Sequence, residues 1–116
     1  MKKIQLIVIL GITSIVLTYC SASKKAKKEI PKSTYATDLS VVIAYSCSPC
    51  HIPAKGGNKK PYDNYANVAK DIDEMIRRIE LNPTDRGFMP FKKTAKLSDS
   101  TINVFKKWKA DGMLEK

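Results

Sequence analysis

The clearest pattern of apolar and polar positions lies between residues 64 and 81. Six apolar side chains recur there every three or four residues, which is the spacing of one face of a helix. They are Tyr65, Val68, Ile72, Met75, Ile76 and Ile79. Acidic residues and arginines lie between them, and Asn82-Pro83 ends the pattern because proline cannot continue a helix. The sequence therefore predicts an amphipathic helix over 64–81 whose apolar face packs against a core.

A second apolar pattern covers residues 38–46. Its apolar side chains follow helical spacing and are Leu39, Val42, Ile43 and Ala44. Thr37 or Asp38 can cap a helix at this point, although the β-branched run at 41–43 leaves a strand open as an alternative. We expect a helix here, and we expect the folded domain to begin near Thr34.

A last helix is predicted after Ser98. Ser98 has the side chain of an N-cap, and Asp99 places a negative charge at the positive end of the helix. The buried face would consist of Ile102, Phe105 and Trp108, which recur every three residues. Gly112 can end the helix. Three helical patterns and no convincing strand predict an all-α fold.

The first 20 residues have the pattern of an export signal. Lys2 and Lys3 precede an apolar run over 4–17, which is shorter than the ~20 residues that a membrane-spanning helix needs. Leu17-Thr18-Tyr19-Cys20 resembles a lipoprotein processing site, although Tyr19 is larger than the residue usual there. We expect a lipoprotein-type signal peptide over 1–19 and lipid on Cys20, with a retained membrane anchor as the alternative.

Residues 20–33 follow with small, polar and lysine-rich side chains. Such a segment cannot form a core, so we expect a flexible linker between the lipid and a domain over 34–116. The chain of 116 residues carries 21 Lys and Arg against 11 Asp and Glu, a formal net charge of +10. This charge favours acidic partners or anionic surfaces, or serves solubility alone. It would also permit nucleic-acid binding, but the expected export argues against that function.

Cys47-Ser48-Pro49-Cys50-His51 carries the most specific chemistry in the sequence. It matches C-x-x-C-H, the attachment signature of c-type haem. Two cysteines three positions apart lie on one side of a helical turn, from which both sulfurs can reach the two vinyl groups along one porphyrin edge. His51, the chain's single histidine, then lies under the iron. We expect one covalently bound haem c on Cys47 and Cys50, with His51 as an iron ligand.

The segments after this motif and after the 64–81 helix are loops by composition. Gly56 and Gly57 permit close approach of the backbone to a flat porphyrin. The carbonyl of Pro61 is the predicted acceptor for the second ring N–H of His51. In the second loop, Met89 lies outside any helical stripe. A loop methionine can simply fill a core, but beside a haem motif its thioether is a candidate for the opposite axial position.

The order of these features resembles a small class I cytochrome c over about residues 38–112. The resemblance rests on Cys47, Cys50 and His51, on the Met89-Pro90 pair, and on Leu97-Ser98, Trp108 and Gly112. It implies a fold of three to four helices around one covalently attached haem. The first and last helices would pack together through residues 39–43, Phe105 and Trp108. It also implies His51 and Met89 as the two axial ligands.

The same resemblance implies a function. Such proteins carry single electrons, and an iron with two protein ligands has no open position, which implies neither enzyme activity nor a small-molecule substrate. The leader and linker resemble those of membrane-anchored bacterial cytochromes, which implies export and a lipid anchor on the periplasmic or cell-surface side of a bacterial membrane. An acidic oxidase or reductase would be the partner, steered by lysines around the haem edge. The candidates are Lys55, Lys59, Lys60, Lys92 and Lys93.

Two other uses of the cysteines remain open. An exported thioredoxin-like protein could use Cys47 and Cys50 as a dithiol, but that fold alternates strands and helices, and Ser46 stands where a tryptophan is usual. A structural zinc site needs four ligands. Cys47, Cys50 and His51 supply three, and the remaining cysteine lies at the expected lipid end.

Overall fold

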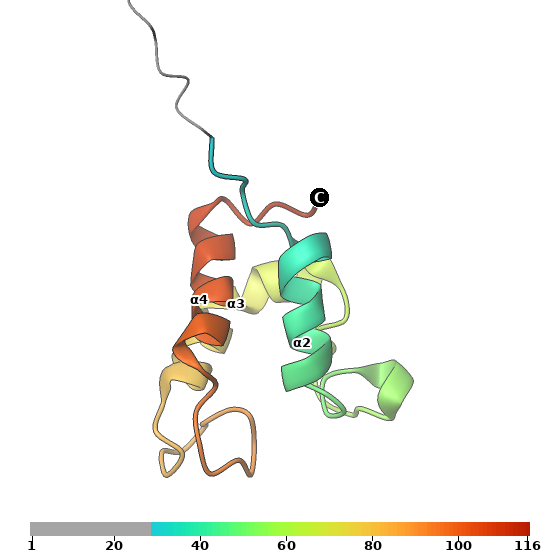
Figure 1. Ribbon diagram of the computed structural model, residues 1–116. Coiled ribbons are helices and arrows are strands. Elements are labelled where there is room, and N and C mark those ends of the chain that lie inside the picture. Colours follow the sequence, from blue (N-terminus) through green and yellow to red (C-terminus); the bar gives the residue numbers. More distant parts are fainter. Residues whose placement is uncertain (1–28) are drawn as a thin grey trace, which may run out of the picture.

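The computed structural model describes residues 29–116, and this part of the chain is helical (Figure 1). The elements are a π-helical turn η1 (Tyr35–Leu39), α2 (Ser40–Ser46), a 3-10 turn η2 (Pro53–Lys55), α3 (Tyr65–Glu80) and α4 (Asp99–Ala110). Between residues 29 and 116 the extended pairing is limited to one isolated bridge, Thr34 with Leu114. The all-α prediction is therefore confirmed for the domain. The expected signal peptide, Cys20 and the linker up to residue 28 lie outside the described residues.

Helix α3 agrees closely with the helix predicted over 64–81. The side-chain oxygen of Asn64 caps it by accepting the N–H of Asn67 at 3.0 Å, and the helix ends at Glu80, before Asn82-Pro83. The buried side of the helix consists of Val68, Ile72, Met75 and Ile79, with Tyr65 and Ile76 partly buried beside them. None of the helices that the structure describes is long and apolar enough to cross a bilayer.

The first helical segment begins earlier than predicted. Thr34, not Thr37 or Asp38, is the cap: its hydroxyl accepts the N–H of Thr37 at 3.2 Å, while the carboxylate of Asp38 accepts the N–H of Thr34 at 2.8 Å. The chain end then fixes the first turn, because Tyr35 donates its N–H to the carbonyl of Leu114 at 2.8 Å. Residues 41–43 lie in α2, so the strand alternative is wrong.

The core joins the first and last helical segments, as the resemblance implied. Leu39 and Ile43 on one side and Phe105 and Trp108 on the other are almost completely buried in one cluster. Trp108 also donates its indole N–H to the carbonyl of Leu114 at 2.8 Å. Ser98 caps α4 as predicted, accepting the N–H of Thr101 at 3.2 Å. Helix α4 packs against both η1 and α3.

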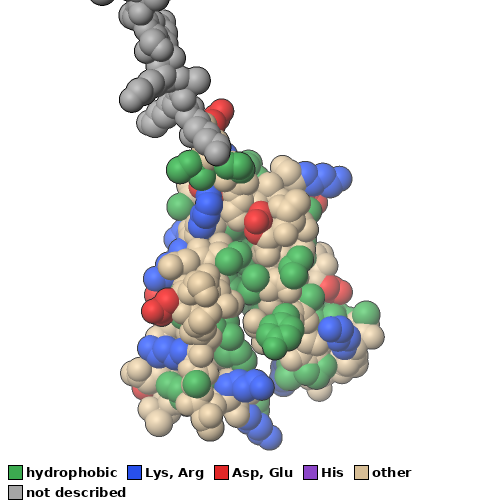
Figure 2. Space-filling model, in the orientation of Figure 1, with side chains coloured by type: hydrophobic (Ala, Val, Ile, Leu, Met, Phe, Trp, Pro, Cys, Tyr) green, Lys and Arg blue, Asp and Glu red, His purple; other side chains and the backbone are tan. Residues whose placement is uncertain are grey.

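A cleft divides the lower end of the domain (Figure 2). One wall is the segment that follows α2, residues 47–62, and the other is the segment between α3 and α4, residues 81–98 (Figure 1). Hydrophobic side chains gather along both walls, and lysine or arginine side chains lie at the open end. The two predicted ligand segments of the sequence therefore face this cleft from opposite sides.

Candidate haem-binding site

The C-x-x-C-H motif forms a closed turn at the end of α2. Cys47 continues the helix by donating its N–H to the carbonyl of Ile43 at 2.9 Å, and His51 donates its N–H to the carbonyl of Cys47 at 3.0 Å. The two cysteines are free thiols, Cys47 half-buried and Cys50 exposed. Packing of Cys47 against the core ties the motif to the helical body. The motif therefore forms one backbone turn at the end of a helix, as predicted.

Gly57 lies directly on the backbone of this turn. A Cβ at Gly57 would lie 2.3 Å from the carbonyl oxygen of Pro49 and 2.6 Å from that of Cys50. A backbone hydrogen bond keeps the two segments together, because Lys59 donates its N–H to the carbonyl of Cys50 at 3.0 Å. Close approach was predicted at this glycine, but the surface it meets is the motif's own backbone. Gly56 serves a different purpose, because it ends η2 with a φ of 81°.

We expect the Gly57→Ala variant to be destabilised. The methyl group would push Pro49 and Cys50 away, and overpacking of this kind costs about 2–3 kcal/mol of unfolding free energy. The matched control is Gly56→Ala, where the new Cβ meets nothing within 4 Å and the left-handed backbone alone costs about 1 kcal/mol. Urea unfolding measures the loss of stability in both variants. Equal losses in the two variants would contradict the close contact at Gly57.

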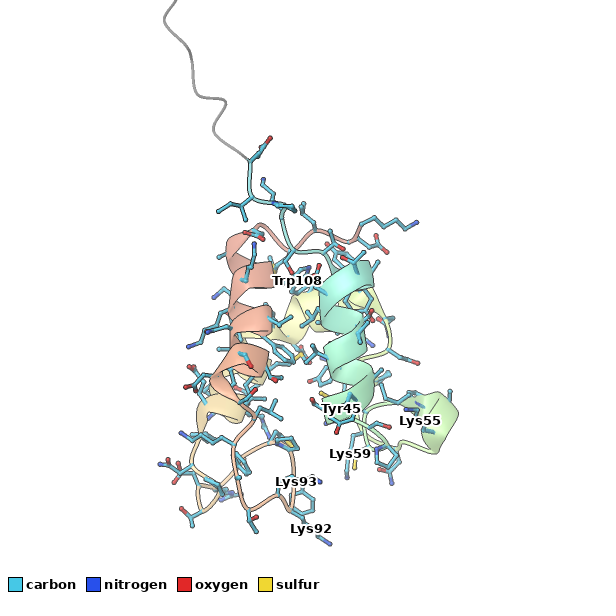
Figure 3. The ribbon with its side chains drawn as sticks, viewed as in Figure 1. Tyr45, Lys55, Lys59, Lys92, Lys93 and Trp108 are labelled. Carbon is cyan, nitrogen blue, oxygen red and sulfur yellow. The ribbon has the colours of Figure 1, made fainter. Side chains whose placement is uncertain are left out.

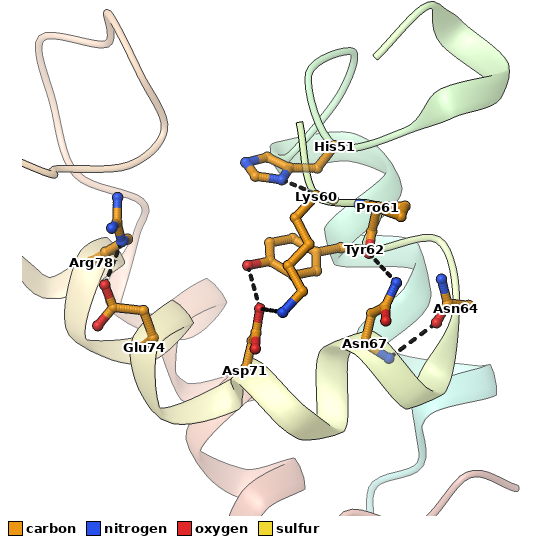
Figure 4. A network of polar contacts seen from close by, with 9 residues as sticks. All are labelled: His51, Lys60, Pro61, Tyr62, Asn64, Asn67, Asp71, Glu74 and Arg78. Atoms are coloured by element: carbon orange, nitrogen blue, oxygen red, sulfur yellow. Dashed lines mark hydrogen bonds and ion pairs between the residues drawn. The ribbon is translucent and has the colours of Figure 1, made fainter. Parts of the chain in front are cut away.

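The imidazole of His51 has one nitrogen engaged and one available. Its Nδ1 lies 2.7 Å from the carbonyl oxygen of Lys60. A carbonyl only accepts, so Nδ1 is the donor of this bond, and Nε2 is the nitrogen whose lone pair could bind a metal in the neutral tautomer. Figure 4 shows the ring extending away from its own loop, toward the side of the molecule where Arg78 lies. This is the arrangement expected of a ligating histidine with a fixed tautomer.

The predicted acceptor, Pro61, is wrong by one residue. The carbonyl of Pro61 instead accepts a hydrogen bond from the side-chain amide of Asn67 at 3.0 Å (Figure 4). A residue before proline favours extended backbone, in which successive peptide groups point to opposite sides. If one of these two carbonyls faces His51, the other faces α3, and the sequence does not say which.

Tyr62 and Asp71 complete the surroundings of His51, and sequence reasoning missed both. The Tyr62 ring stacks on the imidazole, with centroids 4.6 Å apart and planes at 13°. Its hydroxyl donates to Oδ2 of Asp71 at 3.1 Å. Burial, together with that carboxylate, raises the pKa of Tyr62 to about 12, so the ring stays neutral at physiological pH. The hydrogen bond from Lys60 lowers the pKa of Asp71, which stays ionised there.

Met89 lies on the opposite wall of the cleft. Its N–H donates to the carbonyl of Arg78 at 3.2 Å, which fastens the loop to the end of α3, and its half-buried side chain packs on the same core as Cys47. A cavity of about 780 Å³ opens here, with Met89, two phenylalanines and five basic side chains among its lining residues. All of its lining comes from the end of α3 and residues 83–93, so it does not include the C-x-x-C-H turn. Met75, by contrast, is buried in the core on α3.

The thiols are not arranged as in a thiol–disulfide protein. Burial raises the pKa of Cys47 to about 11, whereas the attacking cysteine of a thioredoxin-like protein has a lowered pKa. The thioredoxin fold also requires a sheet, and residues 29–116 form helices. Among those residues no three side chains of the His, Cys, Asp and Glu types gather as a metal site would need. The structure thus gives neither alternative any support.

Comparisons of this chain with protein-family models, with curated proteins and with solved structures found no match.

Proposed function

We propose that this protein is a monohaem c-type cytochrome that carries single electrons between membrane-associated redox partners outside the cytoplasm. The observation that carries the proposal is the state of His51: directly after the two thiols, its Nδ1 is bonded to a backbone carbonyl and its Nε2 is left available. Metal-ligating histidines usually donate their second ring N–H in this way, and this histidine directly follows a C-x-x-C turn. The apolar cleft and the loop methionine across it support the same proposal.

The proposed cofactor is one covalent haem held in the cleft. Cys47 and Cys50 would hold it through thioethers, and His51 and Met89 would be its axial ligands. When bound, the haem supplies a one-electron couple between ferric and ferrous iron. The protein would exclude water from this couple and hold the ligands in fixed positions. The buried side chains of Ile52 and Phe88 would contribute to this, because they are next in sequence to His51 and Met89. With both axial positions taken by protein, we propose no enzymatic reaction and no small-molecule substrate.

Location outside the cytoplasm is part of the proposal, because thioether attachment of haem c takes place there. A lipid on Cys20 would keep the domain at the periplasmic or cell-surface side of a bacterial membrane, with the lysine-rich linker up to residue 33 as the spacer. Ser33 marks the end of that spacer: it is buried, and its N–H donates to the carboxylate of Asp111 at 2.6 Å.

An absorption spectrum of the reduced protein tests the proposal. The chain should be expressed with its leader in cells that mature c-type cytochromes and purified from their membranes. We expect a low-spin haem spectrum, a pyridine adduct typical of haem c, and a mass increased by one haem. A colourless, folded protein whose two thiols both react with maleimide would reject the cytochrome and favour the thiol–disulfide alternative.

We propose an acidic redox protein as the partner, because lysines stand on both sides of the cleft. Figure 3 shows Lys59 on the side of the C-x-x-C-H loop, and Lys92 and Lys93 at the tip of the opposite loop. The five candidates are not equivalent. Lys60 forms an ion pair with Asp71 at 2.5 Å, Lys55 lies 3.4 Å from the carbonyl of Ala44, and Lys92 lies over the Phe91 ring. Lys59 and Lys93 form no ion pair within the described residues.

Electron transfer to an acidic partner should therefore slow as salt is added. Between low and physiological ionic strength we expect the second-order rate constant to fall by roughly tenfold or more, because exposed charges are screened within a Debye length of about 8 Å. Lys59→Gln with Lys93→Gln should weaken this dependence, while Lys109→Gln, whose lysine pairs with Asp73 on the helical body, should leave it unchanged. Stopped-flow experiments would measure this rate constant as a function of salt for each variant. A rate constant that is flat with salt would reject the steering by lysines.

A further inference from the structure

Three successive residues of the loop before α3 are bound to one face of that helix. Asn67 and Asp71 are four positions apart on α3, so their side chains point the same way. Asn67 holds the carbonyl of Pro61 at 3.0 Å. The carboxylate of Asp71 binds the residues on either side of Pro61: it pairs with the ammonium of Lys60 and accepts a hydrogen bond from the hydroxyl of Tyr62 (Figure 4). The loop is therefore fixed to the edge of a helix whose apolar side is buried in the core.

Both bonds to Asp71 end on the same oxygen. Oδ2 lies 2.5 Å from Nζ of Lys60 and 3.1 Å from the hydroxyl of Tyr62. The Asp71 side chain is only 19 % exposed, so these bonds are better protected from solvent than an ordinary surface ion pair. One carboxylate oxygen thus connects the side chains of Lys60 and Tyr62 (Figure 4).

These two residues are the ones that contact the imidazole of His51. The backbone carbonyl of Lys60 accepts its Nδ1–H at 2.7 Å, and the ring of Tyr62 covers one of its faces. Tyr62 also donates its N–H to the carbonyl of His51 at 2.9 Å. The rotation of the imidazole and the strength of its Nδ1–H bond therefore both depend on where the segment 60–62 is held.

We propose that Asp71 is a positioning residue for the proximal histidine: by holding Lys60 and Tyr62 through one oxygen, it sets the orientation and hydrogen bonding of His51. This inference rests on the proposed function, because it assumes that His51 binds the haem iron. A well-held Nδ1–H bond makes an imidazole a more electron-rich ligand and so favours ferric iron. The negative charge of Asp71 acts in the same direction. Loss of either effect raises the reduction potential.

The test compares Asp71→Ala and Asp71→Asn with Asp73→Asn in the full-length, haem-loaded protein. The control removes the same charge from the same helix, but from a side chain that is 77 % exposed and pairs with Lys109. We expect both Asp71 variants to raise the midpoint potential and to change the hyperfine-shifted His51 ring signals of the ferric protein. We also expect amide exchange at Tyr62 to quicken by about tenfold, because its bond to His51 is loosened. The control should shift none of the three.

The outcomes separate this inference from the proposed function. If the wild-type protein carries haem but the Asp71 variants match Asp73→Asn in potential, ring signals and exchange, the positioning role is overturned and the cytochrome stands. If Asp71→Ala does not fold, Asp71→Asn decides alone, because it keeps the size of the side chain and loses the charge. If the wild-type protein carries no haem, the cytochrome is lost, and the exchange at Tyr62 alone decides whether Asp71 holds the loop at His51.

Discussion

Replacing both Cys47 and Cys50 with serine should remove covalent haem completely. A serine hydroxyl does not add to a haem vinyl group, so no thioether can form at either position. The loss should also destabilise the domain. About 80 residues bury a small core that supplies only ~3–5 kcal/mol on its own, and the proposed haem would no longer contribute apolar surface to it. Single variants should keep one thioether and part of the haem.

Mass spectrometry and circular dichroism measure the two effects of this double variant. The mass should equal that of the processed chain without haem, and the helical signal should be weaker and melt at a lower temperature than in the wild type. The third cysteine provides the control, because Cys20→Ser removes a thiol that lies outside the domain and should retain the haem. A double variant with the wild-type spectrum would place the haem elsewhere, and would remove the basis of the proposed function.

Local chemistry made the helices predictable. The apolar stripe of α3 and the cap at Ser98 are determined by nearby residues, because periodicity and capping depend on positions three or four apart. The start of the first helix was missed for the opposite reason. Thr34, Thr37 and Asp38 can each cap a helix, so local chemistry does not choose among them. The backbone of Leu114, almost eighty residues away, binds the first turn at Tyr35, and the local sequence does not record this partner.

The candidate site also has a part that the local sequence predicts and a part that depends on distant residues. The motif places Cys47, Cys50 and His51 together because they are adjacent, and the structure brings them into one turn. The surroundings of His51 could not be predicted, because they depend on how the loop folds back onto α3. A polar pair four positions apart on the edge of an apolar stripe, Asn67 and Asp71, was the one available signal. This pair indicates that another part of the chain is hydrogen-bonded to that side of α3, but it does not identify that part as the segment 60–62.

Replacing Met89 with alanine should lower the reduction potential and open the iron to external ligands. A neutral thioether stabilises ferrous iron relative to the water that would replace it, and changes of axial ligand move haem potentials on the order of 0.1–0.3 V within a total range of about 0.8 V. Spectroelectrochemistry should show the fall in potential, and titration of the ferric variant should show cyanide binding at concentrations that leave the wild type unchanged.

Met75→Leu is the matched control for this variant. Met75 is 5 % exposed within the core face of α3, so a replacement of similar volume should change stability by less than about 1.5 kcal/mol and leave the potential in place. Met89 differs because it lies on a loop that is attached to α3 at Arg78 and that lines a cavity. An unchanged potential in Met89→Ala would therefore mean that another side chain binds the iron. Lys92 and Lys93, on the same loop and lining the same cavity, would be the next to replace.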